Sequence, residues 1–473
     1  MLVRHDRVAA VGRDLARADP VAVGRAEVLD VAGLVVGPGF VDLHSHVHSV
    51  LGQRLQAMDG VTTSLDLEAG LSPTDAAYAA AAAEGRPLHY GFAAAWATRR
   101  CTAVSGQEVP PTITASLALL ADPRLQEDTD PAARARLLAL LGDDLAAGAL
   151  GIGVLVGYAP RSDPAEYLAV ALLAAGAGVP TYTHVRELVE ADPRTPVDGV
   201  DELVRAAAAT GAHMHHCHVN STSRRHVDRV LATLDRARAE GSRVTVEAYP
   251  YGAGATGIGA AFLAPERLGA WDLTPRSITY LPTGETVADA ARLRELRTLD
   301  PGGLCVVRFL DDDDLGDVAL LRRSLTFADS IVASDAMPVA LPAGTDPLVW
   351  PPPAGSVTHP RTAGTFARAL RMMVREIGTW TWVEAFRRCS LLPARVVAEV
   401  APGARGKGWL APGADADLVV LDPAALSDTA SYAEGARPSV GVRHLLVAGT
   451  LLVRDGRLDP TVLPGRPLRG SPA

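Results

Sequence analysis

Short apolar runs rich in β-branched residues alternate along the chain with longer Ala-, Leu- and Arg-rich stretches. The short runs have the length and flanking residues of strands, and the longer stretches have the composition of helices. This alternation predicts βα units and a parallel sheet, and eight such units predict a (β/α)8 TIM-like barrel of the α/β class. The eight predicted strands are residues 34–46, 61–68, 89–96, 150–157, 180–185, 212–219, 244–251 and 330–335.

Two parts of the chain do not fit a plain barrel. The segment 252–329, between predicted strands seven and eight, is too long for an ordinary loop, so we expect an insertion that covers the site as a lid. Residues 1–33 and 404–473 contain short apolar stretches with Gly and Asp turns. They predict one small β-sandwich domain built from both chain ends, which leaves residues 34–403 for the barrel.

The composition narrows the class of protein. A chain of 473 residues that is 48% hydrophobic can bury a large core, and we expect a soluble globular protein. The net charge of -9 and the dispersed arginines argue against nucleic acid as a partner. The four cysteines show no CxxC spacing, the N-terminal stretch lacks an apolar signal core, and the Ala-rich runs are too interrupted for membrane spans. We therefore expect a cytoplasmic protein without membrane contact, and a homo-oligomeric state stays open.

The stretch VDLHSHVH, residues 41–48, suggests what the barrel does. Side chains alternate between the faces of a strand, so His44, His46 and His48 are expected to point the same way. Two or three imidazoles on one face suit a metal ion. The alternative is that these are polar residues at a strand end that only form hydrogen bonds.

Other predicted strands also end in residues that can bind a metal. The carboxyl ends of barrel strands usually carry the functional side chains, and here they carry Glu68, His184, His218 and Asp335. Four imidazoles with a carboxylate suit zinc or a similar metal. For Asp335 the alternative is a carboxylate that caps a turn.

The stretch AHMHHCHVN, residues 212–220, offers four histidines for one or two roles. Alternation puts His216 and His218 on one face and His213 and His215 on the other, facing the helices. His218 lies furthest towards the carboxyl end and is the preferred ligand. Cys217 is then expected to face away from the metal.

These segments resemble the amidohydrolase superfamily and, within it, the N-acyl-D-amino-acid deacylases, which include D-aminoacylases and N-acyl-D-glutamate deacylases. The resemblance covers nearly the whole chain and implies a zinc-dependent hydrolase with one or two zinc ions held by His44, His46, Glu68, His184 and His218. It is carried, in order, by GPGFVDLHSH, DGVTTSLDLEAG, GALGIGVLVGYAP, THVRE, HCHVNS, YPYGAGATG, ASDAMP, THPRTAGTFAR and GADADLVVLDP.

Three positions depart from the family pattern. D-aminoacylases carry a cysteine ligand near the end of strand two, where this chain has Glu68 in LEAG. Many superfamily members use a carboxylated lysine on strand four, but the only lysine here is Lys407, outside the barrel. Asn220 stands where related D-aminoacylases have a lysine, and it is the candidate for substrate contact there. Because a carboxylate can bridge two metals and the barrel has no lysine, Glu68 is favoured as a metal ligand.

The resemblance implies hydrolysis of a linear amide by a metal-activated hydroxide, which zinc makes available near neutral pH. Asp335 is expected to take the proton of the attacking water and return it to the leaving nitrogen. Two other classes stay open: a cyclic-amide hydrolase of the dihydroorotase or hydantoinase type, and a scaffold without catalysis. The first usually has the bridging lysine, and the second would normally have lost some of the ligands.

Substrate binding is expected to depend on arginines. The guanidinium groups of Arg186 in THVRE and Arg361 in THPRT can each hold a carboxylate through two hydrogen bonds. One would bind the α-carboxylate of an N-acyl-D-amino acid, and the other an acidic side chain such as glutamate. The alternative for either is a structural ion pair. The remaining candidates for contact with this small-molecule substrate are Tyr158, Tyr251, Asn220 and His359.

Overall fold

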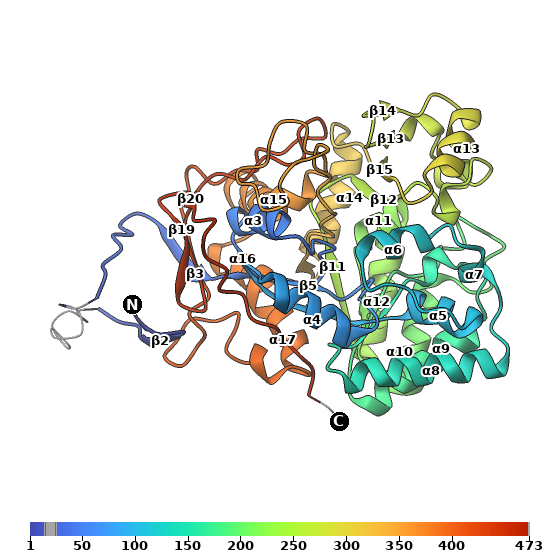
Figure 1. The fold of residues 1–473 in the computed structure, drawn as a ribbon, viewed down its shortest axis with the longest axis horizontal. Coiled ribbons are helices and arrows are strands. Elements are labelled where there is room, and N and C mark those ends of the chain that lie inside the picture. Colours follow the sequence, from blue (N-terminus) through green and yellow to red (C-terminus); the bar gives the residue numbers. More distant parts are fainter. Residues whose placement is uncertain (14, 16–23, 25, 472–473) are drawn as a thin grey trace.

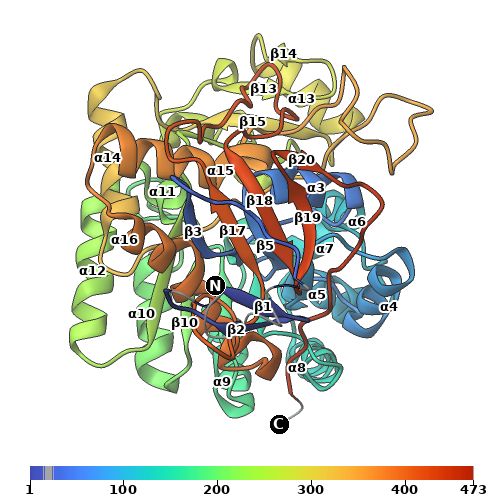
Figure 2. The same ribbon diagram turned by 90° about the vertical axis from the view of Figure 1, so that its left-hand side faces the viewer.

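The computed structural model describes residues 1–13, 15, 24 and 26–471. They form a parallel barrel, a lid above one end of it, and a small antiparallel sheet at its side (Figure 1). In Figure 2 the small sheet faces the viewer, with the helices of the barrel behind it and around it. No helix in this described part of the chain is long and apolar enough to cross a membrane.

Each of the eight predicted barrel strands contains a strand of the structure, and the predicted fold class is confirmed. The third predicted strand is divided into β6 and β7, and two parallel ladders result, β4-β5-β6 and β7-β8-β9-β10-β11-β16. A parallel bridge between Ser45 and Ala336 closes the barrel. The strands are β4 (Phe40–Asp42), β5 (Val61–Asp66), β6 (His89–Phe92), β7 (Ala94–Ala95), β8 (Ile152–Val154), β9 (Thr181–Thr183), β10 (Met214–His216), β11 (Val244–Ala248) and β16 (Ile331–Val332).

Helices cover the outside of the barrel, and several begin at an aspartate whose side chain accepts a hydrogen bond from the first turn. Asp130, Asp163 and Asp198 do so for α8, α9 and α10. The helices are α3 (Val50–Met58), α4 (Thr74–Glu84), α5 (Trp96–Ser105), α6 (Ile113–Leu119), α7 (Pro123–Gln126), α8 (Pro131–Ala146), α9 (Pro164–Ala177), α10 (Gly199–Thr210), α11 (Val219–Ser223), α12 (Val227–Ala239), α14 (Leu315–Thr326), α15 (Arg361–Leu370), α16 (Trp382–Phe386) and α17 (Leu392–Ala398).

A buried apolar cluster fills the barrel below the site. It joins side chains from several barrel strands with residues of α17, among them Val41, Leu65, Leu150, Tyr182 and Ile331. Side chains from strands on opposite sides can meet only inside the barrel, which is therefore packed and not a pore. The end of the barrel opposite α17 is left for polar side chains.

The lid is the segment 253–308, which is built on an antiparallel sheet of four strands in the order β12-β15-β13-β14. Its elements are β12 (Ala253–Gly257), β13 (Ile278–Tyr280), β14 (Glu285–Thr286), α13 (Ala290–Leu299) and β15 (Leu304–Arg308). The insertion is shorter than the predicted 252–329, because α14 packs on β11 and α12 and covers the barrel. Figure 1 shows the lid in yellow, above the helices of the barrel.

The small sheet has the order β20-β19-β18-β17-β3 and combines both ends of the chain. Its strands are β3 (Val35–Pro38), β17 (Leu418–Leu421), β18 (Val442–Val447), β19 (Thr450–Arg454) and β20 (Arg457–Leu458), and a hairpin of β1 (Leu2–Arg4) and β2 (Arg7–Ala10) lies beside it.

The chain passes from the small sheet to the barrel later than the predicted boundary between residues 33 and 34. Strand β3 lies within the predicted barrel range 34–403, but it pairs with β17 of the small sheet. The crossing falls at Gly39, between β3 and β4, where a Cβ atom would lie 2.2 Å from the side chain of Thr62. Only glycine fits at this close approach.

Candidate metal centre and active site

Two imidazoles after the first barrel strand converge on one point. His44 and His46 follow β4 and are both buried. Their Nε2 atoms lie 3.1 Å apart, and both lie within 3.5 Å of one carboxylate oxygen of Asp335. The predicted pair of histidines is therefore placed as a pair of metal ligands would be.

Buried carboxylates orient both rings. Nδ1 of His44 lies 2.5 Å from Oε1 of Glu247, and Nδ1 of His46 lies 3.2 Å from Oδ2 of Asp66. A carboxylate accepts the proton of Nδ1, which leaves the lone pair on Nε2. This arrangement of carboxylate, imidazole and metal is common in zinc sites.

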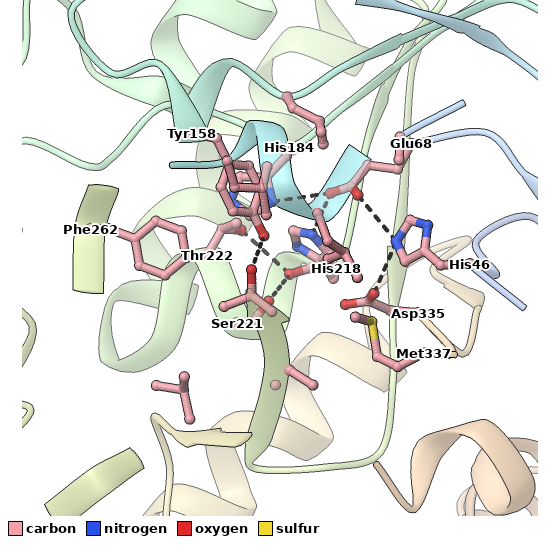
Figure 3. Close-up of a pocket in the computed structure, with 18 of the residues that line it drawn as sticks. His46, Glu68, Tyr158, His184, His218, Ser221, Thr222, Phe262, Asp335 and Met337 are labelled. Atoms are coloured by element: carbon pink, nitrogen blue, oxygen red, sulfur yellow. Dashed lines mark hydrogen bonds and ion pairs between the residues drawn. The ribbon is translucent and has the colours of Figure 1, made fainter. Parts of the chain in front are cut away.

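Glu68 connects this pair to two further histidines. Its Oε2 lies 3.2 Å from Nε2 of His44, and its Oε1 lies 3.0 Å from Nδ1 of His184 and 2.8 Å from Nε2 of His218. Figure 3 shows the carboxylate between His46 on one side and His184 on the other. One carboxylate oxygen thus faces each pair of histidines, which is the arrangement of a bridging ligand.

The backbone conformation at His218 determines which of the preceding histidines point to the same side of the strand as its ring. Strand β10 ends at His216, and His218 has a φ of 32°, in the left-handed region. The alternation of a strand therefore does not continue to His218, and the prediction that His216 shares its face is wrong. His215 instead lies beneath the site, with Nε2 3.0 Å from Glu247, while Nδ1 of His216 lies 3.0 Å from the carbonyl oxygen of Cys217.

Cys217 also differs from its predicted orientation. It belongs to the apolar cluster inside the barrel, and its sulfur lies within 4.8 Å of ligand atoms of His44 and Glu247. The expectation that it faces away from the site is wrong for the same reason, the left-handed backbone at His218.

Asp335 and Arg361 close the site on one side. Asp335 follows β16 with a φ of 49°, and its Oδ1 lies 2.8 Å from Nη2 of Arg361. Burial alone would raise the pKa of Asp335, but the guanidinium of Arg361 and the ring of His44 outweigh it and hold that pKa below its usual value. Asp335 is therefore ionised at neutral pH and can accept a proton.

Glu68 is ionised as well. Its burial would raise the pKa, yet the surrounding imidazoles of His44, His184 and His218 hold the pKa well below its usual range. The site therefore gathers negative charge in a buried place, as a cation site requires.

The side chains that converge here fit a zinc ion. Nitrogen and oxygen atoms of two groups, His44 with Glu68 and His218, and His44 with His46 and Asp335, lie within 4.8 Å of one another. Imidazole and carboxylate donors of this kind suit zinc. The Nε2 atoms of His44 and His46 lie 3.1 Å apart, close enough for both to bind one cation.

A cavity opens above these residues between the barrel and the lid. Its volume is about 850 Å³, including the mouth that opens to solvent. Polar atoms lie at its floor, whereas α6 and the lid supply apolar walls. The lining includes His46, Glu68, Tyr158, His184, His218, Ser221, Thr222, Tyr249, Asp335 and Arg361, and the apolar Ile113, Leu117, Leu120, Phe262, Trp271, Leu273, Val307, Phe309 and Met337.

Two of the six predicted substrate-binding residues line this cavity. Arg361 is buried, and its Nε and Nη1 have no hydrogen-bond partner among the described residues. Tyr158 presents its hydroxyl 3.0 Å from Oγ1 of Thr256. Both therefore offer hydrogen bonds at the cavity wall.

Arg186 is not one of the lining residues, and its predicted role as a substrate clamp is corrected. Its guanidinium forms two hydrogen bonds with Glu202, at 3.0 and 2.9 Å, and a third with the carbonyl oxygen of Pro160. Each of its three nitrogens thus donates a hydrogen bond within the protein core. Arg186 therefore forms a structural ion pair with Glu202, which was the alternative role considered for it from the sequence.

The other three predicted contacts also lie behind the cavity wall. Asn220 accepts a hydrogen bond from the backbone of Tyr249 and donates one to the carbonyl oxygen of Tyr251, so it holds that turn in place. Tyr251 packs edge-on against His359, and Nδ1 of His359 accepts the backbone N–H of Arg361. These residues support the wall but do not line it.

Sequence reasoning missed several residues that shape the site. Glu247 is a lone acidic residue within the apolar strand VTVEA, a pattern that signals a buried charge with a partner. Asp66 stands two residues before Glu68, on the strand that already carried a ligand. Tyr249, Phe262 and Trp271 have no signal in the sequence, because the lid and the turn after β11 bring them to the cavity only in the folded chain.

Comparisons with known proteins agree with this geometry. A model of the amidohydrolase family matches residues 27–453. An N-acyl-D-glutamate deacylase of Alcaligenes xylosoxydans xylosoxydans is 30% identical, over 99% of this chain and 92% of its own. A D-aminoacylase of the same organism is 27% identical, over 94% of this chain and 89% of its own. The structure of an N-acyl-D-glutamate deacylase from Bordetella bronchiseptica, complexed with zinc and a phosphonate inhibitor, aligns with a TM-score of 0.72 at 25% identity, covering 99% of this chain and 94% of that one.

Proposed function

Because the chain belongs to the amidohydrolase family, we propose that it is a zinc-dependent hydrolase that cleaves the amide bond of N-acyl-D-amino acids. The observation that carries the proposal is the position of Glu68, with one oxygen facing each pair of histidines, next to the ionised Asp335. Its substrate is a small molecule.

The zinc, as one or two ions, would be held by His44, His46, Glu68, His184 and His218. When bound, zinc lowers the pKa of a coordinated water and polarises the carbonyl of the scissile amide. The carboxylates of Asp66 and Glu247 keep the rings of His46 and His44 in the orientation that leaves Nε2 free.

Asp335 is the proposed general base and acid. Its Oδ1 lies within 3.5 Å of Nε2 of His44 and of His46, so it lies next to the position where the water would be bound. It would accept the proton of that water and deliver it to the leaving nitrogen. Arg361, 2.8 Å away, keeps the carboxylate charged until the proton arrives.

Arg361 is also the proposed site for the α-carboxylate of the substrate. Two of its nitrogens, Nε and Nη1, lack partners among the described residues although they are buried. A buried guanidinium with free N–H groups at a cavity wall is costly unless a ligand accepts from it, and a substrate carboxylate could accept a charge-assisted hydrogen bond from Nη1.

The two alternative functions are less well supported. Cyclic-amide hydrolases usually have a bridging lysine in the barrel, whereas the only lysine of this chain is Lys407, paired with Asp415 and Asp417 near the small sheet. A scaffold without catalysis would be expected to have lost ligands, whereas the five proposed ligands of this chain are all present, with the four histidines around Glu68.

We further propose that the enzyme is cytoplasmic and has no nucleic-acid or membrane partners. All four cysteines are buried and unpaired in the described chain, which suits a reducing compartment. Cell fractionation with an antibody against the protein tests the compartment, and light scattering of the purified enzyme tests whether it forms a homo-oligomer. Recovery in a membrane or secreted fraction would contradict this part.

The function is tested by metal analysis and a substrate screen. Elemental analysis of the purified protein is expected to find one to two zinc ions per chain. The zinc-loaded enzyme is expected to release free D-amino acids from N-acyl-D-amino acids and to leave the L enantiomers and cyclic amides uncleaved. Cleavage of dihydroorotate or hydantoin in preference to linear amides would overturn the proposal.

A further inference from the structure

The cavity above the metal centre has a polar and an apolar half. The apolar half is walled by residues of α6 and the lid that no role in the proposed chemistry uses: Ile113, Leu117, Leu120, Phe262, Trp271 and Leu273. We infer that this half is a subsite for the acyl chain and that the enzyme prefers N-acyl substrates with medium-length or aromatic acyl groups over N-acetyl ones. The inference rests on the proposed function and specifies its substrate.

The orientation of the substrate in the cavity follows from the two residues that would contact its amino-acid half. Asp335 would protonate the leaving nitrogen, and Arg361 would bind the α-carboxylate, and these two side chains lie 2.8 Å apart. The amino-acid half therefore lies on their side of the scissile carbon. The acyl half must extend the other way, across Glu68 towards His184.

The apolar wall begins on that side. The ring of His184 lies 4.6 Å from the ring of Tyr158 and 6.4 Å from the ring of Phe262, measured between centroids. In Figure 3, Phe262 and Asp335 lie on opposite sides of His218, with Tyr158 and His184 on the side of Phe262. An acyl chain that leaves the metal centre past His184 thus meets Tyr158 and Phe262 first.

The wall continues as a stack of flat groups. The rings of Phe262 and Trp271 are nearly parallel, with centroids 5.1 Å apart and an interplanar angle of 9°. The guanidinium of Arg224 lies over the ring of Trp271, 3.6 Å from the centroid. Such cation–π and stacking contacts fix the ring before a ligand arrives, so an apolar chain that covers it loses little free energy to ordering the protein.

A second line of apolar side chains faces the same space. Leu117 on α6 and Leu120 directly after it line the cavity together with Leu273 of the lid. The methyl group of an acetyl substituent is too small to cover walls that come from both α6 and the lid, whereas each further methylene would remove apolar surface from water.

The test is a series of N-acyl-D-methionines with acetyl, butanoyl, hexanoyl and octanoyl groups. For the zinc-loaded enzyme, we expect kcat/KM to rise about two- to fourfold with each added methylene until the wall is covered. Trp271→Ala and, on another segment, Leu117→Ala should each flatten this rise. Trp409→Ala, which removes a partly exposed tryptophan near the small sheet, is the matched control and should leave the rise unchanged.

Direct binding gives a readout that does not depend on turnover. Calorimetry should find that octanoate, the carboxylate product of the longest substrate, binds wild-type enzyme at least about tenfold more tightly than acetate, and that Trp271→Ala removes most of this difference. Equal affinities of octanoate and acetate would overturn the inference, as would a preference that follows the amino-acid side chain and ignores acyl length.

Failure of the inference differs from failure of the proposed function. If kcat/KM is the same for all acyl lengths while free D-methionine is released, the acyl subsite is wrong and the deacylase function stands. If the zinc-loaded enzyme cleaves neither this series nor any other N-acyl-D-amino acid of the substrate screen, the deacylase function is wrong, and the binding of octanoate then decides alone whether the apolar half accepts an acyl chain.

Discussion

At the scale of single residues, the chemistry of this site depends on which side-chain nitrogens are left for a metal ion or a substrate. His44 and His46 each give one ring nitrogen to a buried carboxylate and keep the other for the metal centre. Arg361 gives one nitrogen to Asp335 and keeps two, whereas Arg186 keeps none because Glu202 and a carbonyl oxygen use its donors. Three predictions belong to this scale.

The first concerns Glu68. In Glu68→Gln the side chain keeps its shape but loses its charge and one of its two acceptor oxygens, so one pair of histidines loses its carboxylate partner. Zinc content and turnover should both fall while the protein remains folded. Elemental analysis and circular dichroism check this, with the exposed Glu84→Gln as control. A fully zinc-loaded Glu68→Gln enzyme would remove Glu68 from the ligand set.

The second concerns the proposed base. Asp335→Asn should lower kcat by about 10²- to 10⁴-fold, because an amide cannot accept the proton of the attacking water. Zinc content should stay near that of the wild type, since the histidines and Glu68 remain, and circular dichroism should show a folded protein even if the lost charge beside the buried Arg361 lowers the unfolding temperature. Turnover within about threefold of the wild type would reject this role for Asp335.

The third separates the two arginines. Arg361→Lys should lower kcat/KM about ten- to a hundredfold, because a point charge cannot donate to Asp335 and to a substrate carboxylate in the fixed directions of the guanidinium N–H groups. Arg186→Lys should instead destabilise the fold by about 1.5 to 3 kcal/mol through the lost bonds to Glu202, with a nearly unchanged KM. Kinetics on N-acetyl-D-methionine and urea unfolding of both variants distinguish the effects. A raised KM in Arg186→Lys would return that residue to the binding site.

At the scale of secondary-structure elements, glycines allow the strand ends to approach one another. A Cβ atom on Gly157, after β8, would lie 2.4 Å from the ring of His184 and 2.5 Å from the carbonyl oxygen of Val185. The segment after β9 therefore holds His184 in place only because its neighbour has no side chain.

Gly157→Ala should accordingly displace His184, lower zinc occupancy and reduce turnover. Gly176→Ala in α9 is the matched control, since a methyl group added there would meet no atom of the described residues within 4 Å outside the backbone of its own helix. Alanine should stabilise that helix by about 0.5 to 1 kcal/mol. Metal analysis and thermal unfolding of both variants check the contrast. Equal zinc content in the two would show that the close approach at Gly157 does not position His184.

At the scale of the whole molecule, buried charges connect the barrel to the small sheet. Asp417 lies just before β17 and accepts from Nε2 of His89 on β6 at 3.0 Å and from Nζ of Lys407 at 2.5 Å. Burial alone would raise the pKa of Asp417, but His89 and Lys407 outweigh it and hold that pKa well below its usual value. The single lysine of the chain thus serves the contact between domains.

This contact predicts a pH dependence of stability. Because the pKa of Asp417 is lower in the folded than in the unfolded protein, the carboxylate stabilises the fold above its unfolded pKa of about 3.9, and this stabilisation is lost as the pH falls below that value. Asp417→Asn should therefore lower the unfolding temperature at pH 7, and the gap to wild type should narrow below about pH 4. Calorimetric scans from pH 3 to 8 measure both. If the difference in unfolding temperature between wild type and Asp417→Asn does not change with pH, the destabilisation comes from altered packing and not from the lost charge.

The sequence by itself predicted the barrel and the candidate metal ligands, and it excluded a bridging lysine in the barrel. These follow from local rules: strands and helices have different periods, and the carboxyl ends of parallel strands meet at one end of a barrel, so His44, Glu68 and His184 were expected to converge. The tertiary structure alone decided which face His215 and His216 present, because one left-handed residue at His218 interrupts the alternation. It also decided that Arg361 faces the cavity while Arg186 is used within the core, since the partner of a guanidinium depends on residues that only folding brings near. The apolar wall of Phe262 and Trp271 depends in the same way on where the lid packs, which no local pattern encodes.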